Sequence, residues 1–343
     1  MSPLDSIDSR LLDLLACPRD YTEFAVDDRH LVCGLGHRYP VVSGVPVLLL
    51  AECEPTLGIE AASLRAADNG VGGPLYLDTI AVPIELKRHI VRDWNAHTKV
   101  DAVVSYLLGA TAGQGYVKSV GRLQSYPIPD IPVGPSDDER LLDIGSSWGR
   151  WSLSAARKGW QVVGLDPSLG AIMAARRVID QFVLDMSFVC ADARFLPFKA
   201  DVFRCVFSYS VIQHFSELDA ELALAEAGRV LCRGGLAKIQ MAHRGGVRST
   251  YCRTRRAYSG SGRFRVRYWS LASLRDVFER KIGRSALTAE AFGGLGLLAE
   301  DRSYVSIEAK ILIAISTCLK ALSIHVRWLI RFADSVYVES VKQ

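Results

Sequence analysis

The sequence lacks several features that would assign it quickly to a class of protein. It has no internal repeat, no low-complexity tract, and no apolar run long enough to cross a bilayer without charged residues inside it. Its net charge is +4 at pH 7, which is too small by itself to indicate a nucleic-acid-binding protein. These absences favour an ordinary globular chain without a transmembrane span.

The first residues also lack the pattern of a secretory signal. The stretch MSPLDSIDSRLLDLLA contains acids where a signal peptide needs a basic segment and a long apolar stretch. The eight cysteines are scattered along the chain. We therefore expect a cytoplasmic protein whose thiols are reduced, mostly buried and inert.

The most apolar late segment is KILIAISTCLKALSIHVRWLIRFAD, and basic residues interrupt it. At about 100° per residue, Lys320, Arg327 and Arg331 fall within about 40° of one another, which predicts an amphipathic helix with a basic face. One interpretation is a helix packed against its own domain with a solvated cationic edge. The alternative is contact with a membrane surface.

Three zones follow one another along the chain. Residues 8–50 contain short strand-like segments and predict a small β-rich unit. Residues 51–139 begin with a stretch rich in Gly, Ala and Asp, which we interpret as a linker, and continue as a helical cap region. In residues 140–343 strands and helices alternate, which predicts an α/β domain with a parallel sheet and a helical insertion at about 294–333.

The segment LLDIGSSWGRW at residues 141–151 has the form of a buried strand that leads into a ligand-binding turn. Gly145 and Gly149 let the backbone approach a ligand closely. The dinucleotide pattern G-x-G-x-x-G is absent and bulky Trp148 occupies the turn, so a nucleotide without phosphates suits it better. Asp143, just before the turn, is placed to fix the turn and orient a cationic amino-acid moiety.

Acids also end the next two predicted strands. Asp166 ends the second strand, where a carboxylate can accept hydrogen bonds from both ribose hydroxyls. Asp192 ends the third strand, where it can accept from an adenine amino group. Since ligands bind at the carboxyl ends of such strands, both acids are candidate binding residues.

Taken together, these segments resemble the class I S-adenosylmethionine-dependent methyltransferases. LLDIGSSWG, VVGLDPS, ADARFLPF, VFSYSVIQHFSE and RVLCRGG occur in order within residues 140–241, and the nearest type is the group named after ubiquinone and menaquinone biosynthesis. The resemblance implies a Rossmann-like seven-stranded methyltransferase sheet and an enzyme that uses S-adenosylmethionine. It also implies these cofactor-binding residues: Asp143, Gly145, Ser146, Gly149, Asp166, Pro167, Asp192, Ala193, Arg194 and Ser208. Ser147 departs from the pattern, since many members carry glycine there.

The segment SYSVIQHF follows the fourth strand, where this fold usually faces its acceptor. Tyr209, Gln213 and His214 are candidates to orient or deprotonate the acceptor, and the ordinary pKa of histidine suits a general base. The alternative is that His214 caps or packs the following helix. Many methyltransferases need no base, so the presence of His214 decides nothing by itself.

An arginine-rich segment follows the fifth strand, with tyrosines and a phenylalanine interleaved. Guanidinium groups suit phosphate or carboxylate, which favours a small, anionic acceptor such as a phosphorylated or lipid-linked metabolite. A solvated basic loop is the simpler interpretation. An RNA methyltransferase and a non-catalytic cofactor-binding partner of another enzyme are further alternatives. The arginines are Arg244, Arg248, Arg253, Arg255, Arg256, Arg263, Arg265 and Arg267.

The N-terminal unit resembles the small zinc-ribbon-like domain of the tRNA-methyltransferase activator subunit. Cys17-Pro18 and YPVVSGVPVLLL match that family, while Asp20 stands where its second cysteine should be. Cys33 and His37 have a C-x₃-H spacing that related ribbons use for zinc. Cys17, Asp20, Cys33 and His37 are therefore the candidate zinc ligands. Because a cysteine is replaced, we favour a metal-free ribbon stabilised by docking on the larger domain.

Overall fold

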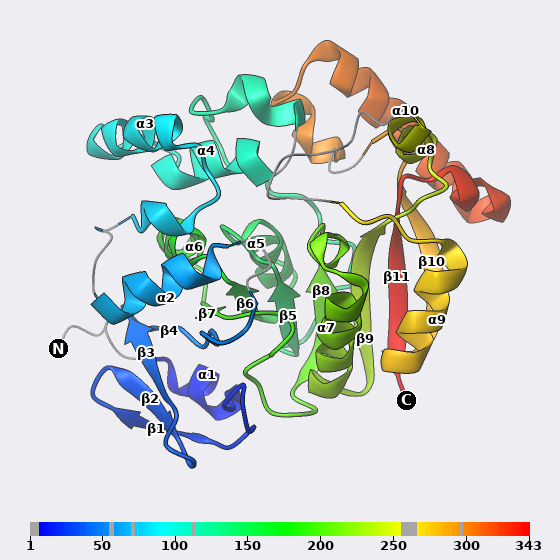
Figure 1. Cartoon of the computed structure of the whole chain (residues 1–343). Helices are drawn as coiled ribbons and strands as arrows, with labels where there is room; N and C mark the ends of the chain where they lie inside the picture. The colour runs from blue at the N-terminus through cyan, green and yellow to red at the C-terminus, as the bar shows by residue number, and fades with distance from the viewer. Residues whose placement is uncertain are drawn as a thin grey trace.

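The protein is described by a computed structural model that covers residues 7–54, 58–69, 73, 75–111, 114–254, 266–294 and 298–343. A small four-stranded antiparallel sheet lies beside a seven-stranded mixed sheet that is flanked by helices (Figure 1). The predicted fold class is therefore confirmed: α/β, with a Rossmann-like seven-stranded sheet of the methyltransferase type and a small N-terminal β-rich unit.

The N-terminal unit, called the ribbon below, docks on the edge of the large sheet. Leu15 pairs with Phe198 in an antiparallel bridge, and Val47 pairs with Cys190 in a parallel one. Leu15, Leu31 and Phe198 are fully buried in one shared hydrophobic cluster. The ribbon consists of α1 (Ser9–Leu14), β1 (Phe24–Asp27), β2 (His30–Cys33), β3 (Arg38–Val42) and β4 (Val45–Pro46).

The stretch interpreted as a linker contains helix α2 (Glu60–Asn69), so that interpretation was wrong for these residues. Ile59, Ser63 and Ala66 recur at helical spacing and are all buried, which gives the helix a packed face. Composition rich in small and acidic residues hid this periodicity. The cap region continues with η2 (Leu77–Thr79), α3 (Ile84–Asn95), α4 (Ala102–Thr111) and η3 (Gln114–Ser119).

The large sheet has the strand order β10-β11-β9-β8-β5-β6-β7. Strands β5 to β9 are parallel, and β11 runs antiparallel to both of its neighbours. The order reverses between β5 and β8, so the carboxyl ends of these strands form the expected ligand-binding edge. The strands are β5 (Arg140–Ile144), β6 (Gln161–Asp166), β7 (Met186–Cys190), β8 (Phe203–Ser208), β9 (Leu231–Ala242), β10 (Gly283–Ala291) and β11 (Ser335–Lys342).

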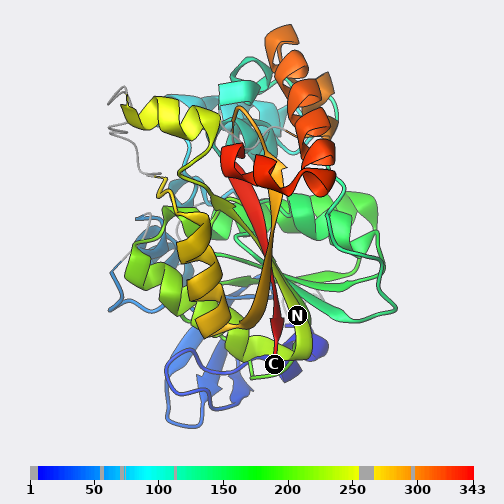
Figure 2. The same cartoon turned by 90° about the vertical axis from the view of Figure 1, so that its right-hand side faces the viewer.

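Helices cover both faces of this sheet, which explains why most residues of its central strands are apolar and buried. Leu141, Leu142 and Ile144 of β5 are fully buried. In Figure 2 the yellow-green and gold helices α7 and α9 lie on one side of the sheet, and the green helices lie on the other. The helices that follow or join the strands are α5 (Arg150–Ala156), α6 (Leu169–Phe182), η4 (Ile212–His214), α7 (Glu217–Val230), α8 (Val247–Thr254) and α9 (Leu271–Lys281).

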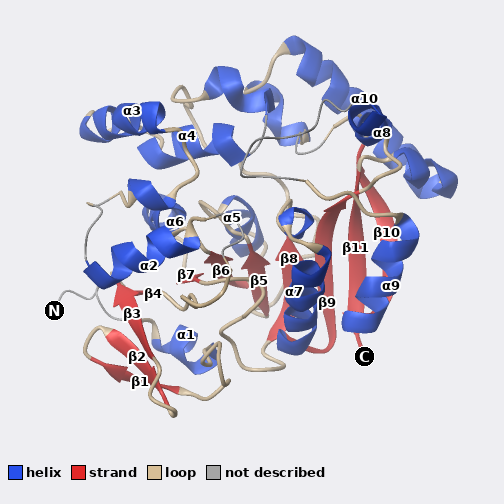
Figure 3. Ribbon diagram, in the orientation of Figure 1, coloured by secondary structure: helices blue, strands red, loops and turns tan. Residues whose placement is uncertain are grey.

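An insertion between β10 and β11 is helical, and it lies near the edge of the sheet far from the ribbon (Figure 3). It contains η5 (Ala299–Ser303), α10 (Ile307–His325) and η6 (Arg327–Phe332). The expectation of one continuous basic-faced helix was wrong. Val326 leaves helical geometry with φ −109° and ψ 76°, so Arg327 and Arg331 belong to η6 and not to the helix that carries Lys320.

Among the described residues, no helix combines the length and apolar character that crossing a bilayer requires. The division into residues 8–50, 51–139 and 140–343 stays a prediction. One buried cluster contains Leu31 of the ribbon and Leu142 of β5, and a second contains Val47 of the ribbon and Val162 of β6. The hydrophobic core thus runs across the predicted boundaries.

Candidate functional site

The turn after β5 has the backbone geometry for which its glycines are needed. Gly145 and Gly149 have φ of +76° and +84°, in the left-handed region that favours glycine. Ser147 adopts the same region at +49°, so the departure from the family pattern is accommodated as a left-handed serine. A Cβ on Gly145 would lie 2.1 Å from Cγ2 of Val211, so no side chain fits there.

Two buried polar atoms at this turn have no hydrogen-bond partner among the described residues: Oδ1 of Asp143 and Oγ of Ser146. The other carboxylate oxygen of Asp143 accepts from the Ser152 hydroxyl at 2.6 Å. Burial raises the pKa of Asp143 to about 7. Because buried polar atoms are normally bonded, these two fit the ammonium and carboxylate end of S-adenosylmethionine.

Asp166 lies at the end of β6 and holds two backbone turns together. It accepts from the backbone N–H of Ser147 at 3.0 Å and from that of Ser168 at 2.9 Å. Burial raises its pKa to about 6. A carboxylate has further lone pairs beyond these two bonds, so it can still accept from ribose hydroxyls. Pro167 lies between the two turns, and its carbonyl accepts from the Ser63 hydroxyl at 2.7 Å.

The residues predicted to flank adenine form a rigid cluster after β7. The Arg194 guanidinium donates to Asp192 Oδ2 at 2.6 Å, and the Arg194 backbone N–H donates to Asp192 Oδ1 at 2.8 Å. Arg194 also donates to the carbonyl of Glu54 at 2.7 Å. Ala193 is buried between the pair. Sequence reasoning placed these residues at the site but missed that they bond each other.

The strand end nearest the expected methyl-transfer position carries Ser208 and Tyr209. The Ser208 hydroxyl donates to the carbonyl of Ile144 at 3.0 Å, which ties β8 to β5. The next residue, Tyr209, is directed away from β5, because its hydroxyl donates to Glu290 of β10 at 3.1 Å. The Tyr209 ring centroid lies 4.7 Å from that of Trp151. This contact makes Tyr209 part of a buried aromatic cluster.

The other two acceptor candidates lie on η4. The Gln213 amide donates to the Ser210 hydroxyl at 2.7 Å, and its Oε1 has no partner among the described residues. His214 is half-buried at the end of the same turn. The backbone carbonyl of Gln213 accepts from the N–H of Arg267 at 2.8 Å. The unbonded Gln213 oxygen makes it the better placed of the two to receive a ligand donor.

A cavity of about 140 Å³ lies beneath α10 and was missed by sequence reasoning. Its lining includes Trp151, Glu290, Lys320 and Tyr337. Burial raises the pKa of Glu290, which accepts from the hydroxyls of Tyr209 and Ser335. These side chains come from α5, β10, α10 and β11, so no local sequence pattern could have gathered them.

Only part of the arginine-rich segment can be placed. Arg244 and Arg248 are exposed near the start of α8. Arg267 bonds the Phe215 carbonyl at 2.8 Å and so supports η4. Arg255, Arg256, Arg263 and Arg265 lie outside the described residues, as does the side chain of Arg253.

The ribbon brings its four candidate metal ligands together. One ligand atom from each of Cys17, Asp20, Cys33 and His37 lies within 4.8 Å of the other three. His37 Nδ1 is 3.6 Å from Cys17 Sγ, 3.3 Å from Cys33 Sγ and 2.9 Å from Asp20 Oδ2. Ligands on a tetrahedral zinc ion are about 3.3–3.8 Å apart. The two distances from His37 to sulfur lie in this range, so these four side chains are the ones that would hold a zinc ion.

The ribbon and the cap region both reach the cofactor-binding edge. Leu48 donates its backbone N–H to the carbonyl of Cys190 at 2.8 Å, two residues before Asp192. The Ser63 hydroxyl of α2 accepts from the N–H of Leu169 at 3.1 Å, at the start of α6. Thr79 Oγ1 accepts from the N–H of Gly170 at 2.7 Å. The N-terminal third thus holds the loops that would surround a nucleoside.

Comparison with known proteins agrees with this geometry. A family profile described as a methyltransferase domain matches residues 141–235. The bifunctional biotin biosynthesis protein BioHC of Cellvibrio japonicus is 37% identical over 164 residues, which is 48% of this chain and 29% of that protein. A ubiquinone biosynthesis O-methyltransferase of Brucella anthropi is 32% identical over 108 residues, which is 32% of this chain and 42% of that protein.

A third relative matches the ribbon. A UPF0434 protein of Mannheimia succiniciproducens is 43% identical over 49 residues, which is 13% of this chain and 80% of that protein. Among solved structures, phosphoethanolamine N-methyltransferase 2 of Haemonchus contortus matches with a TM-score of 0.42 and 18% identity, over 62% of this chain and 50% of that one. The chain spans 29% of the biotin biosynthesis protein and 42% of the ubiquinone biosynthesis O-methyltransferase.

Proposed function

The chain belongs to the UPF0434 family through its ribbon and carries a methyltransferase domain after it, and from this premise we propose that it is an S-adenosylmethionine-dependent methyltransferase. The observation that carries the proposal is the pair of unbonded buried atoms, Asp143 Oδ1 and Ser146 Oγ, at a left-handed glycine turn. Asp166 at the next strand end supplies a carboxylate for the ribose. The enzyme works in the cytoplasm, in keeping with the seven free cysteines among the described residues.

The proposed mechanism needs little chemistry from the protein. The cofactor supplies a methyl group on a good leaving group, so the chain must hold an acceptor in line and exclude water. Asp143, Ser146 and Asp166 orient the amino-acid and ribose parts of the cofactor. Ser208 positions the end of β8 beside the reacting centre, and Gln213 offers its free oxygen to an acceptor donor. We propose His214 as the general base for an acceptor that must lose a proton.

The acceptor is proposed to be small and anionic. The support for this is the arginine-rich segment, of which Arg244 and Arg248 are exposed at the β9–α8 connection. The cavity beneath α10 contains Glu290 beside Lys320, so it does not itself suit a simple anion. A phosphorylated or lipid-linked metabolite would combine the negative charge that these arginines bind with an apolar part.

The ribbon is proposed to support the cofactor site from the same chain. Its Leu48 bond to Cys190 holds the end of β7, and the bond from Arg194 to Glu54 holds the loop after it. Asp192 and Arg194 therefore depend for their position on the ribbon and on Glu54 in the segment that follows it. Zinc binding by Cys17, Asp20, Cys33 and His37 is not needed for this role.

The test is turnover of S-adenosylmethionine to S-adenosylhomocysteine by the purified full chain, with acceptors offered as pools of phosphorylated and lipid-linked metabolites. Product formation that is lost in Asp166→Ala supports the proposal. Cofactor binding with no turnover on any pool would favour a non-catalytic partner. Methylation of co-purified RNA would show that the acceptor is RNA and not a small molecule.

A further inference from the structure

The outer surface of the C-terminal insertion carries an apolar stripe that nothing in the described chain covers. Ile307, Ile311, Ile315 and Leu322 of α10 are all exposed, from 48% to 69% of each residue. At about 100° per residue they lie within about 80° of one another around the helix axis. Four large aliphatic side chains on one exposed face make an apolar patch that solvent does not favour, while Ile313 is the buried residue of this helix.

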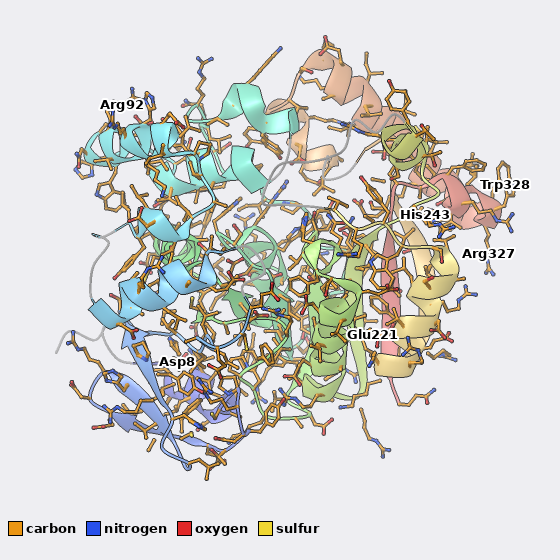
Figure 4. The ribbon with its side chains drawn as sticks, in the orientation of Figure 1. Asp8, Arg92, Glu221, His243, Arg327 and Trp328 are labelled. Carbon is orange, nitrogen blue, oxygen red and sulfur yellow. The ribbon has the colours of Figure 1, made fainter. Side chains whose placement is uncertain are left out.

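The stripe continues into η6 with two aromatic residues. Trp328 and Phe332 are 59% and 46% exposed, and their rings meet edge to face with centroids 5.8 Å apart. In Figure 4 Arg327 and Trp328 project from the outer end of the insertion, away from the body of the molecule. The amphipathic indole of a tryptophan beside cationic side chains is typical of a membrane–water interface, and Phe332 adds apolar area.

The charge of this segment is mostly of one sign. Residues 309–333 include Lys310, Lys320, Arg327 and Arg331 and contain no Asp or Glu, so Glu308 beside Ile307 is the one acid between Ile307 and Phe332. All four cations are exposed, but Lys320 also lines the cavity beneath the helix, so Lys310, Arg327 and Arg331 are grouped with the stripe. We call the six apolar side chains and these three cations the α10–η6 ridge.

We propose that the α10–η6 ridge docks on the surface of an anionic phospholipid bilayer. Apolar side chains enter the boundary between headgroups and acyl chains, while the cations pair with lipid phosphates. The excess of cations along the ridge, three against the single acid Glu308, is the charge complementarity that selects this occupant. A second copy of the chain is disfavoured because a two-fold contact would bring the same cations together. The proposal concerns binding alone, so it stands independently of methyl transfer.

The experiment is flotation of the full chain with vesicles of two compositions, phosphatidylcholine alone and an equimolar mixture of phosphatidylcholine and phosphatidylglycerol. The wild-type protein is expected to float with the mixed vesicles and to bind phosphatidylcholine at least about tenfold more weakly. The double variants Ile311→Ser/Ile315→Ser and Arg327→Ser/Arg331→Ser should each weaken binding to mixed vesicles by at least about tenfold.

The matched control is Leu218→Ser on α7, which removes an aliphatic side chain that is 72% exposed on another surface. It should bind like the wild type. Circular dichroism and cofactor affinity show that each variant is folded. Wild-type protein that does not float, double variants that float as it does, or equal binding to both compositions would overturn the proposal. If the wild-type protein is a dimer and Ile311→Ser/Ile315→Ser makes it monomeric, the ridge binds a second copy of the chain instead.

Discussion

Leu48 and Cys190 are joined by a backbone hydrogen bond of 2.8 Å, so the last residues of the ribbon extend the β7 edge of the large sheet. On the other side of this contact the N–H of Ala16 donates to the carbonyl of Pro197 at 3.0 Å, and that of Lys199 donates to Leu14 at 2.9 Å. The ribbon is therefore fixed by backbone bonds on two sides of a shared apolar core. It should fold as part of the larger domain.

The first prediction concerns this docked surface. Leu15→Ala removes a fully buried side chain between the ribbon and Phe198, and should lower the free energy of unfolding by about 2–5 kcal/mol. Leu35→Ala, at a position 69% exposed in the same ribbon, should change it by less than about 0.5 kcal/mol. Urea titration measures both. Two separate transitions in the wild type would contradict the shared core.

The second prediction tests Asp166 as a cofactor ligand. Asp166→Ala should weaken S-adenosylmethionine binding in calorimetry by about 1–3 kcal/mol, because buried hydroxyls lose their acceptor. The substitution also removes bonds to the N–H groups of Ser147 and Ser168, so thermal unfolding is measured alongside. Asp185→Ala, an exposed carboxylate before β7, is the control. Equal affinity of wild type and Asp166→Ala would remove Asp166 from the site.

The third prediction is a pH dependence of cofactor affinity. Burial raises the pKa of Asp143 to about 7 and that of Asp166 to about 6, so the folded chain binds more protons than the unfolded chain between about pH 4 and pH 7. Stability of the ligand-free protein should therefore fall as pH rises through that window. A cationic ligand favours ionised Asp143, so affinity should rise over the same window by at most about tenfold per unit per proton.

Calorimetry across that range measures this slope, and Asp143→Asn supplies the comparison. The variant should bind more weakly, and its affinity should depend less on pH because one titrating carboxyl is gone. The same slope in both proteins would show that Asp143 does not meet the cation of the ligand.

The fourth prediction concerns the buried ion pair of Arg150 and Asp301, which links the first residue of α5 to the C-terminal insertion. The Tyr116 hydroxyl also donates to Asp301, which is fully buried. Asp301→Ala should destabilise the fold by about 3–5 kcal/mol because the Arg150 charge is left uncompensated. The double variant Arg150→Met/Asp301→Leu should recover most of that loss.

The control is Asp276→Ala, which breaks the exposed pair with Arg280 on α9 and should cost at most about 1 kcal/mol. Thermal and urea unfolding provide the measurements. A small effect of Asp301→Ala would mean that Arg150 finds solvent or another partner, and the insertion would then be less firmly joined to the cofactor turn.

The strands of the large sheet were predictable because each is a short apolar run bounded by turn residues, as Leu141 and Leu142 before Gly145 illustrate. The turn itself was predictable because positive φ at Gly145 requires glycine. Helix α2 was missed because its buried residues are Glu60, Ser63 and Ala66, which are polar or small and give a weak periodic signal.

Contacts between distant segments were beyond reach of the sequence. Tyr209 was predicted at the acceptor side from its position after β8, but its partner Glu290 comes from β10, 81 residues later. The break of the C-terminal helix at Val326 was likewise hidden, because the apolar and basic pattern continues through it without a Gly or Pro. No local sequence pattern indicates that Asp301 is the partner of Arg150.

The last prediction concerns metal in the ribbon. The four candidate ligands lie close enough together to hold zinc, and two of them also bond the rest of the ribbon: Asp20 accepts from the Thr22 N–H at 2.8 Å, and Cys17 lies 3.4 Å from the Tyr39 hydroxyl. Cys33 and Tyr39 are also buried in the core that the ribbon shares with the large domain. We therefore propose that docking, and not a metal, is the main stabilising contact, and we expect chelator-treated protein to remain folded and to bind S-adenosylmethionine. Elemental analysis of protein purified without chelator should find far less than one zinc per chain. Close to one zinc per chain that is lost in Cys33→Ser, together with unfolding on chelation, would show instead that the ribbon depends on its metal.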